Sequence, residues 1–361
     1  MVNGIMVGCD LHDKSMLLKI AVGQAKPLVR SWGTDGPARR AMIRDLLGRA
    51  QQAHGGRIVF AYEACGFGFG LHDELSAAGI EAYVLAPSKM ARSAKHRRGK
   101  TDERDAQALL DLVGAHVLAG VAMPSVWVPD LATRDDRELV RRRLSVAEDG
   151  AAAQTRIRWL LKRYGIESVP SSCTLDYWHQ LGRLVEARRP SGASSALASL
   201  MRQTEWLWQE TQRLDDEVLA LSRAPRYAAV VAALRRHKGV GVLTAMVYLT
   251  ELGDLGRFAN RRQVGSFLGL TPSSHESGED DDHKGHITRQ GPGRVRKVLC
   301  QAVWSSIRVV PGERAAYDRV VRKNPKHKKI AVVARMRALA VRLWHAGLEA
   351  QRLARAEPAV A

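Results

Sequence analysis

The sequence has no long hydrophobic run, and this absence argues against a membrane-spanning protein. None of its apolar stretches approaches the roughly 20 residues that a membrane-spanning helix needs. The beginning of the chain also lacks a positively charged segment before its first apolar stretch, so no secretory leader is indicated. We therefore expect a cytoplasmic protein.

Cysteine is scarce, and the few cysteines lie far apart in the sequence. The chain has four cysteines, and no two of them form a Cys-x-x-Cys pair. They are Cys9, Cys65, Cys173 and Cys300. Such spacing suggests neither a zinc ribbon nor a disulfide framework, so we expect ordinary reduced thiols.

Acidic residues are fewer than basic ones in this sequence. Asp and Glu total 37 against 56 Lys and Arg, which gives a formal net charge of +19. The 361 residues exceed one typical domain, and 45% hydrophobic content is enough for two or three cores. A globular chain with this excess of positive charge is typical of proteins that bind polyanions. We expect a nucleic-acid partner and association with the nucleoid.

The first part of the chain, residues 1–125, predicts an α/β domain. GIMVGCD and MLLKIAVG are two apolar runs around a turn-like segment, which indicates a hairpin. RIVFAYEA and IEAYVLAP predict two further strands, each preceded by helical sequence. The expected order is strand-strand-helix-strand-helix-strand.

Four carboxylates in this part could form one cluster. Asp10 and Glu63 end two predicted strands, and Asp102 and Asp105 lie on one face of the helix predicted by TDERDAQALLDLVGAH. Singly, each is explained as a turn former or a helix cap. Together they would repel one another unless cations neutralised them, and all-oxygen ligands favour Mg²⁺ or Mn²⁺. This order of carboxylates is typical of ribonuclease-H-like nucleases, which use paired metals to cleave phosphodiesters.

The densest basic run, KMARSAKHRRGK, directly precedes the Asp-x-x-Asp pair. We expect it to bind backbone phosphates and so bring a nucleic acid to the metals. Its predicted nucleic-acid contacts are Lys95, Arg97, Arg98 and Lys100.

Residues 126–230 predict a helical region with a heptad repeat between Leu197 and Leu221. One seam position is occupied by Leu197, Thr204, Thr211 and Val218, and the other by Leu200, Leu207, Leu214 and Leu221. The repeat favours a dimerising coiled coil. The alternative is a core helix packed inside its own domain.

Residues 231–361 predict a third, mostly helical unit. KGVGVLTA has glycines between helices, as in helix-hairpin-helix modules whose backbone N–H groups hold a phosphate. The predicted nucleic-acid contacts of this unit are Lys238, Arg289, Arg294 and Arg296.

Several of these motifs resemble a known family in order and spacing. VGCDLHDKS, AYEACGFG and KTDERDAQAL, followed much later by KGVGVLTAMVYLTELGDLGRFANRRQVGSFLGLTPSSHESG and GHITRQGPGRVRKVL, resemble the insertion-sequence one-ten family of DEDD transposases. These are relatives of the Piv-type DNA invertases. The resemblance covers the first 115 residues and roughly residues 236–310.

The resemblance implies a fold, a mechanism and partners. It implies a RuvC-like (RNase-H-like) nuclease domain, a helical coiled-coil insertion and a mostly helical C-terminal transposase domain. The tetrad falls on Asp10, Glu63, Asp102 and Asp105, which would be both catalytic and metal-binding, and the nucleophilic serine falls on Ser277. The implied partners are donor DNA, target DNA, a structured noncoding guide (bridge) RNA and further copies of the chain, as a dimer or tetramer.

Two other functions remain open from the sequence. A Holliday-junction-type endonuclease would use the same four carboxylates with water as the nucleophile and would not need Ser277. A non-enzymatic RNA- or DNA-binding protein would need no tetrad, and the presence of all four carboxylates argues against it.

Overall fold

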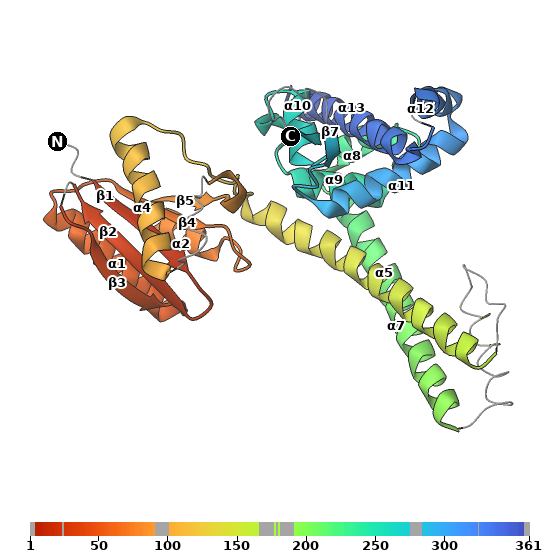
Figure 1. The fold of residues 1–361 in the computed structure, drawn as a ribbon, viewed down its shortest axis with the longest axis horizontal. Coiled ribbons are helices and arrows are strands. Elements are labelled where there is room, and N and C mark those ends of the chain that lie inside the picture. Colours follow the sequence, from red (N-terminus) through yellow and green to blue (C-terminus); the bar gives the residue numbers. More distant parts are fainter. Residues whose placement is uncertain are drawn as a thin grey trace, which may run out of the picture. The chain divides into compact units, whose positions relative to one another are not determined.

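The computed structural model describes residues 4–23, 25–90, 101–165, 177, 180, 191–274, 284–323 and 325–356. The chain divides into two compact units, Met1–Val128 and Pro129–Ala361. Figure 1 shows a sheet with helices in the first unit and an almost entirely helical second unit. This agrees with the expected combination of an α/β domain and helical regions, although the predicted boundary at residue 230 lies inside the second unit and stays a prediction.

The first unit is built on a five-stranded sheet with the strand order β3-β2-β1-β4-β5. The strands are β1 (Ile5–Leu11), β2 (Ser15–Val22), β3 (Leu28–Gly33), β4 (Ile58–Glu63) and β5 (Glu81–Leu85). The first three strands form an antiparallel meander, whereas β4 and β5 run parallel to β1. The predicted hairpin and the two later strands are therefore confirmed.

Helices cover both faces of this sheet. Helices α1 (Gly36–Gln52) and α2 (Gly70–Ala77) share a core with the β1 side chains of Ile5, Val7 and Cys9. Helix α4 (Asp102–Ala119) packs on the other face, against Met6 of β1 and against Val59 and Ala61 of β4. Alternate residues of β1 thus enter different cores, as the two-residue period of a strand requires.

The sequence prediction missed β3. Among the described strands β3 lies at the sheet edge with β2 as its one neighbour, and its Leu28 and Val29 are 42% and 40% exposed. An edge strand buries little on either face, so it has no clear alternation of apolar and polar residues. The short 3-10 helix η1 (Pro87–Lys89) follows β5.

Gly8 brings α4 unusually close to β1. A Cβ atom at this position would lie 2.3 Å from the carbonyl oxygen of Ala106 and 2.3 Å from the amide nitrogen of Leu110. These are backbone atoms of α4, so they cannot move aside as a flexible side chain would. Glycine is therefore required where the helix backbone crosses the strand.

The second unit begins with two long helices packed side by side, α5 (Leu131–Arg163) and α7 (Ser191–Ser222) (Figure 1). They are antiparallel, because Arg143 in the first half of α5 pairs with Asp215 in the second half of α7 at 2.6 Å. At the other end of the pair, Ile157 and Leu161 of α5 pack with Leu197 of α7.

The heptad seam of α7 packs against α5 of the same chain. Leu207 and Leu214 share a buried cluster with Val146 and Ala153. Thr204 is buried in the seam, and its hydroxyl donates to the Leu200 carbonyl at 2.9 Å, so the polar group is satisfied within the helix. The alternative of a core helix inside its own domain is therefore the one observed, and these residues no longer support dimerisation.

Shorter helices complete the second unit around one large core. They are α8 (Ala228–Arg235), α9 (Val242–Leu252), the 3-10 helix η2 (Leu255–Arg257), α10 (Arg261–Phe267), α11 (Gly293–Val309), α12 (Pro311–Lys323) and α13 (Lys328–Ala356). A two-stranded ribbon pairs β6 (Pro272–Ser274) with β7 (Lys284–Ile287). Val140 and Leu144 of α5 and Val218 of α7 enter the same core. This core anchors one end of the helical pair, called its root below, where α5 begins and α7 ends.

The structure explains one glycine of the predicted phosphate-binding hairpin. Gly239, between α8 and α9, has φ +91°, and a Cβ there would lie 2.3 Å from the Ala302 carbonyl of α11. Gly239 therefore allows α11 to pack closely against the turn. Gly241 has no atom within 4 Å of an added Cβ, so it faces open space at the start of α9.

Replacing Gly8 with alanine should destabilise the first unit. Overpacking typically costs about 1–3 kcal/mol, and a clash with backbone atoms places this change in the upper part of that range. The measurement is the thermal or urea unfolding of the full chain, monitored by circular dichroism.

Gly114→Ala, in α4 itself, is the matched control. An added Cβ at Gly114 meets no atom within 4 Å, and alanine favours a helix interior by about 1 kcal/mol over glycine. The control should therefore be as stable as wild type or more stable. Equal stability of the Gly8→Ala variant and wild type would contradict the close-contact explanation.

Candidate cation site at the end of strand β1

The site lies where two parallel strands end beside each other. Cys9 of β1 pairs with Tyr62 of β4, so the following residues, Asp10 and Glu63, are neighbours at the carboxyl edge of the sheet. Strand alternation places both on the face covered by α4, since Gly8 of β1 and Ala61 of β4 meet that helix.

The close contact at Gly8 positions the first turn of α4 over this edge. The turn between Ala106 and Leu110 lies against Gly8, so Asp102 and Asp105, at the beginning of the helix, come to the end of β1. The Thr101 carbonyl accepts hydrogen bonds from the amides of Arg104 and Asp105, which fixes this first turn. Acidic residues here also interact favourably with the positive end of the helix dipole.

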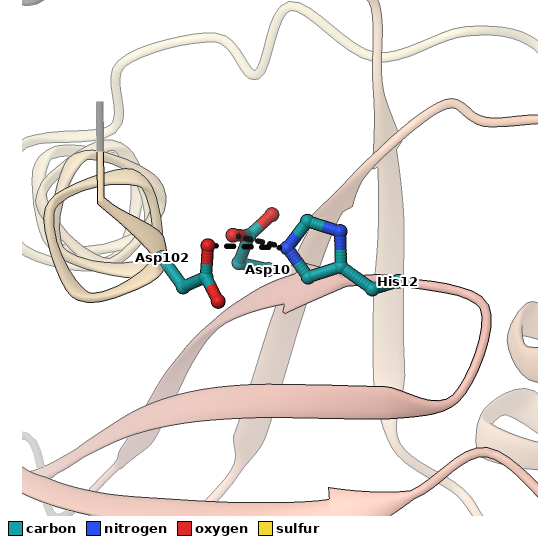
Figure 2. A group of neighbouring side chains, drawn as sticks. All are labelled: Asp10, His12 and Asp102. Atoms are coloured by element: carbon teal, nitrogen blue, oxygen red, sulfur yellow. Dashed lines mark hydrogen bonds and ion pairs between the residues drawn. The ribbon is translucent and has the colours of Figure 1, made fainter.

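A histidine completes the cluster, and the sequence prediction missed it. His12 lies in the turn between β1 and β2, and its Nε2 is 3.0 Å from Asp10 Oδ2 and 3.3 Å from Asp102 Oδ1. Figure 2 shows the imidazole of His12 directed at both carboxylates, with Asp102 approaching from α4. The sequence could have indicated His12 through the spacing of Asp10-Leu11-His12, because residues two apart at a strand end lie on one face of the sheet.

The charges of the cluster act on Asp10. Burial raises the pKa of Asp10 above its usual value, and the negative charges of Asp105 and Asp102 raise it further. The charge of His12 and its hydrogen bond each lower this pKa by less than burial raises it, and the net shift is upward. Asp105 is therefore close enough to Asp10 to affect its ionisation.

A divalent cation fits this donor set. Asp10, His12 and Asp102 each offer one ligand atom, and these three atoms lie within 4.8 Å of one another. A cation would offset the repulsion that raises the pKa of Asp10. Carboxylate oxygens suit Mg²⁺ and Mn²⁺, while an imidazole nitrogen suits transition metals.

Of the predicted tetrad, Asp10 and Asp102 meet directly around His12, while Glu63 and Asp105 are placed near Asp10 less directly. The distances join Asp10 and Asp102, the strand register places Glu63 beside Asp10, and the electrostatic effect on Asp10 places Asp105 nearby. Their catalytic and metal-binding roles stay predictions. Ser277 lies outside the described residues, as do the four predicted contacts of the basic run, Lys95, Arg97, Arg98 and Lys100.

The other predicted nucleic-acid contacts lie in the second unit. Lys238, Arg289 and Arg294 are exposed, so a phosphate could reach them. Arg296 is half-buried, and its Nη1 donates to the carbonyls of Leu268 and Gly291 at 3.0 and 3.1 Å. Its guanidinium therefore holds the chain ahead of α11, although the predicted contact with nucleic acid is untested.

Three of the four cysteines lie in the described part of the chain. Cys9, Cys65 and Cys300 are free, and burial raises the pKa of the Cys9 thiol, so that thiol stays protonated. Cys173 lies outside the described residues. Across the part of the chain that the structure describes, no helix has the length and apolarity needed to span a membrane.

The Asp10→Asn variant should be at least as stable as wild type at pH 7 without divalent cations. Because burial raises the folded-state pKa of Asp10, its ionised form opposes folding as the pH rises through that value, and neutral Asn avoids this loss. A divalent cation should stabilise wild type by mass action, but not this variant.

Thermal unfolding in EDTA and in excess Mn²⁺ is the measurement. Asp111→Asn, at an exposed position of α4, is the control and should keep the wild-type response to the cation. An Asp10→Asn variant that Mn²⁺ stabilises as much as wild type would show that Asp10 is not a ligand.

Comparison with known proteins shows which family the sequence around this site matches. A DEDD transposase family matches residues 7–166, and a second one, described as "Transposase IS116/IS110/IS902 family", matches residues 231–318. The first match contains the whole carboxylate cluster, and the second contains Ser277.

Similar individual proteins point to the same family. The Sinorhizobium fredii transposase-family protein y4qE is 30% identical over 315 residues, which are 83% of this chain and 71% of that protein. The transposase of insertion sequence element IS1111A from Coxiella burnetii is 24% identical over 78% of this chain and 74% of its own length. The transposase of IS1533 from Leptospira borgpetersenii is 23% identical over 83% and 84%, respectively. The chain therefore belongs to the IS110 family of transposases.

Proposed function

We propose that this transposase cuts and rejoins DNA strands with a cation-dependent site at the end of β1 and a serine nucleophile. The observation that carries the proposal is the meeting of Asp10 and Asp102, from a strand and a helix far apart in the sequence, around His12 within 3.3 Å. This cluster lies inside the segment that matches the DEDD family.

The first unit supports an RNase-H-like assignment. Its strand order, β3-β2-β1-β4-β5, combines an antiparallel meander with two parallel strands, and helices lie on both faces. In open α/β sheets, sites form beyond the carboxyl ends of parallel strands, which is where Asp10 and Glu63 lie. The RuvC-like character of the unit is part of the proposal.

The carboxylates and the basic run have separate tasks in this proposal. Asp10, Glu63, Asp102 and Asp105 hold the cations, and the rigid contact at Gly8 maintains the distance between strand and helix. Bound Mg²⁺ or Mn²⁺ would supply Lewis-acid polarisation of the scissile phosphate. The basic run before α4, residues 89–100, binds the DNA backbone on the approach to the site.

Ser277 is the proposed nucleophile. It belongs to the segment that joins β6 to β7, and its support is the sequence resemblance and its place in the second family match. The serine oxygen attacks phosphorus, a phosphoserine bond forms, and one bridging phosphorus–oxygen bond breaks to leave a strand with a free hydroxyl. The energy of the phosphodiester is kept in this link, so rejoining to a second strand needs no ATP.

The remaining partners follow from charge and family resemblance. We propose donor and target DNA and a structured noncoding guide RNA, all of which suit a net charge of +19. A dimer or tetramer is proposed because two DNA molecules must be cut. The α7 seam does not supply this contact, since it packs against α5. Localisation in the cytoplasm with the nucleoid belongs to the same proposal.

Replacing Asp102 with asparagine should lower strand cleavage by about 100-fold or more, because loss of a charged ligand removes several kcal/mol of transition-state stabilisation. DNA binding should persist, since the basic surface is unchanged. Cleavage and gel-shift assays on the same substrate separate the two effects.

The matched control for this variant is Asp111→Asn, which removes a carboxylate from the same helix at an exposed position outside the cluster. It should cleave as wild type does. Wild-type cleavage by Asp102→Asn would remove the proposed site.

Ser277→Ala should abolish a covalent protein–DNA adduct that survives denaturation, because alanine has no oxygen to form the link. The measurement is a denaturing gel of the reaction with labelled DNA. Ser305→Ala, at an exposed serine of α11, should leave the adduct intact. Cleavage by Ser277→Ala without any adduct in wild type would favour the water-using endonuclease instead.

A further inference from the structure

His12 is the one member of the cluster that the proposed carboxylate tetrad does not explain. Strand pairing does not require a histidine here: the backbone amide of His12 closes the β1–β2 turn by donating to the Ser15 carbonyl, and any residue except proline could do this. Its side chain is 42% exposed, so it is not held by core packing either. Its direction is set by the two carboxylates that it contacts (Figure 2).

The position of Nε2 is that of a ligand atom. It lies 3.0 Å from one carboxylate oxygen and 3.3 Å from another, and the three donor atoms are all within 4.8 Å of one another. Ligand bonds of about 2.0–2.2 Å place donor atoms around one ion roughly 3 to 4.4 Å apart. Shifts of a few tenths of an ångström would therefore let all three bind the same cation.

We propose that His12 is a third cation ligand beside Asp10 and Asp102, and that its nitrogen makes the site favour Mn²⁺ over Mg²⁺. This inference rests on the proposed cation-dependent function and specifies the site's metal preference. It adds a residue from the β1–β2 turn to a ligand set otherwise drawn from strand ends and α4.

The preference follows from ligand chemistry. Mg²⁺ prefers oxygen ligands and retains several waters, so exchanging a water for an imidazole gains it little. Mn²⁺ accepts nitrogen ligands more readily, although it too binds carboxylates well. A site with two carboxylate oxygens and one imidazole nitrogen should thus discriminate between the two ions more than four carboxylates would.

The alternative is that His12 only offsets negative charge between Asp10 and Asp102. In that case a bound cation would replace it, and the imidazole would turn away. The two possibilities differ in whether a nitrogen atom is bonded to the metal. This difference can be measured directly and does not depend on turnover.

The experiment uses the full-length protein with Mn²⁺ as the probe. Pulsed electron paramagnetic resonance of the Mn²⁺ complex should show coupling to a ¹⁴N nucleus in wild type and none in His12→Ala. The Mn²⁺ affinity of His12→Ala should fall by at least about tenfold, the lower limit seen even for residues that only support a ligand. The Mg²⁺ affinity, measured by competition, should fall less.

Two further variants sharpen the result. His12→Asp restores an oxygen ligand, so it should bind Mn²⁺ without nitrogen coupling and discriminate less against Mg²⁺. His54→Asn changes an exposed histidine in the loop after α1, at a left-handed position that asparagine tolerates, and should leave coupling and affinity unchanged.

The outcomes separate this inference from the proposed function. If wild type binds Mn²⁺ without nitrogen coupling, and His12→Ala binds it equally well, the role of His12 is wrong while the carboxylate site stands. If wild type binds neither Mn²⁺ nor Mg²⁺, both the cation-dependent function and the role of His12 are overturned.

Discussion

The contact of α4 with Gly8 is the constraint on which the site depends. A single missing Cβ lets the helix backbone lie directly on β1, and the first turn of α4 then falls at the strand end. Strand and helix residues that are far apart in the sequence are thereby held at hydrogen-bonding distance around His12. A larger residue at position 8 would push α4 outward and open the cluster even with every carboxylate intact. The geometry of the site is thus set by backbone packing as much as by the charged residues.

Strand alternation made a large part of this site predictable. Asp10 and Glu63 each end an apolar run, and a parallel register brings such positions together on one edge of the sheet. His12 was not predicted, because a histidine in a turn has many ordinary explanations and only the fold shows what it faces. Strand β3 was missed for a different reason, since an edge strand with Leu28 and Val29 exposed has no buried face to impose a pattern.

The heptad repeat of α7 shows a different limit of sequence reasoning. A seam of leucines specifies that a helix has an apolar partner, but the pattern is the same whether that partner is another chain or an earlier helix. In this chain the partner is α5, and the two threonines fit because their hydroxyls donate to carbonyls of their own helix. Loop length and the partner's own pattern decide between the two cases, and neither is contained in the α7 sequence.

The helical pair α5–α7 is long and is held at one end, so a small rotation at that end would move its other end much further. At 1.5 Å per residue, the 33 residues of α5 extend over about 50 Å, longer than one turn of B-form DNA at roughly 34 Å. Its root is fixed in the core of the second unit through Val140, Leu144 and Val218, and an ion pair of Arg141 with Glu251 ties it to α9. From Val140 to Arg163 the free arm is about 35 Å long, so a tilt of about 5° at that root would displace the far end by roughly 3 Å. Repacking by less than a side-chain diameter around α9 would thus become a displacement the size of a nucleotide step.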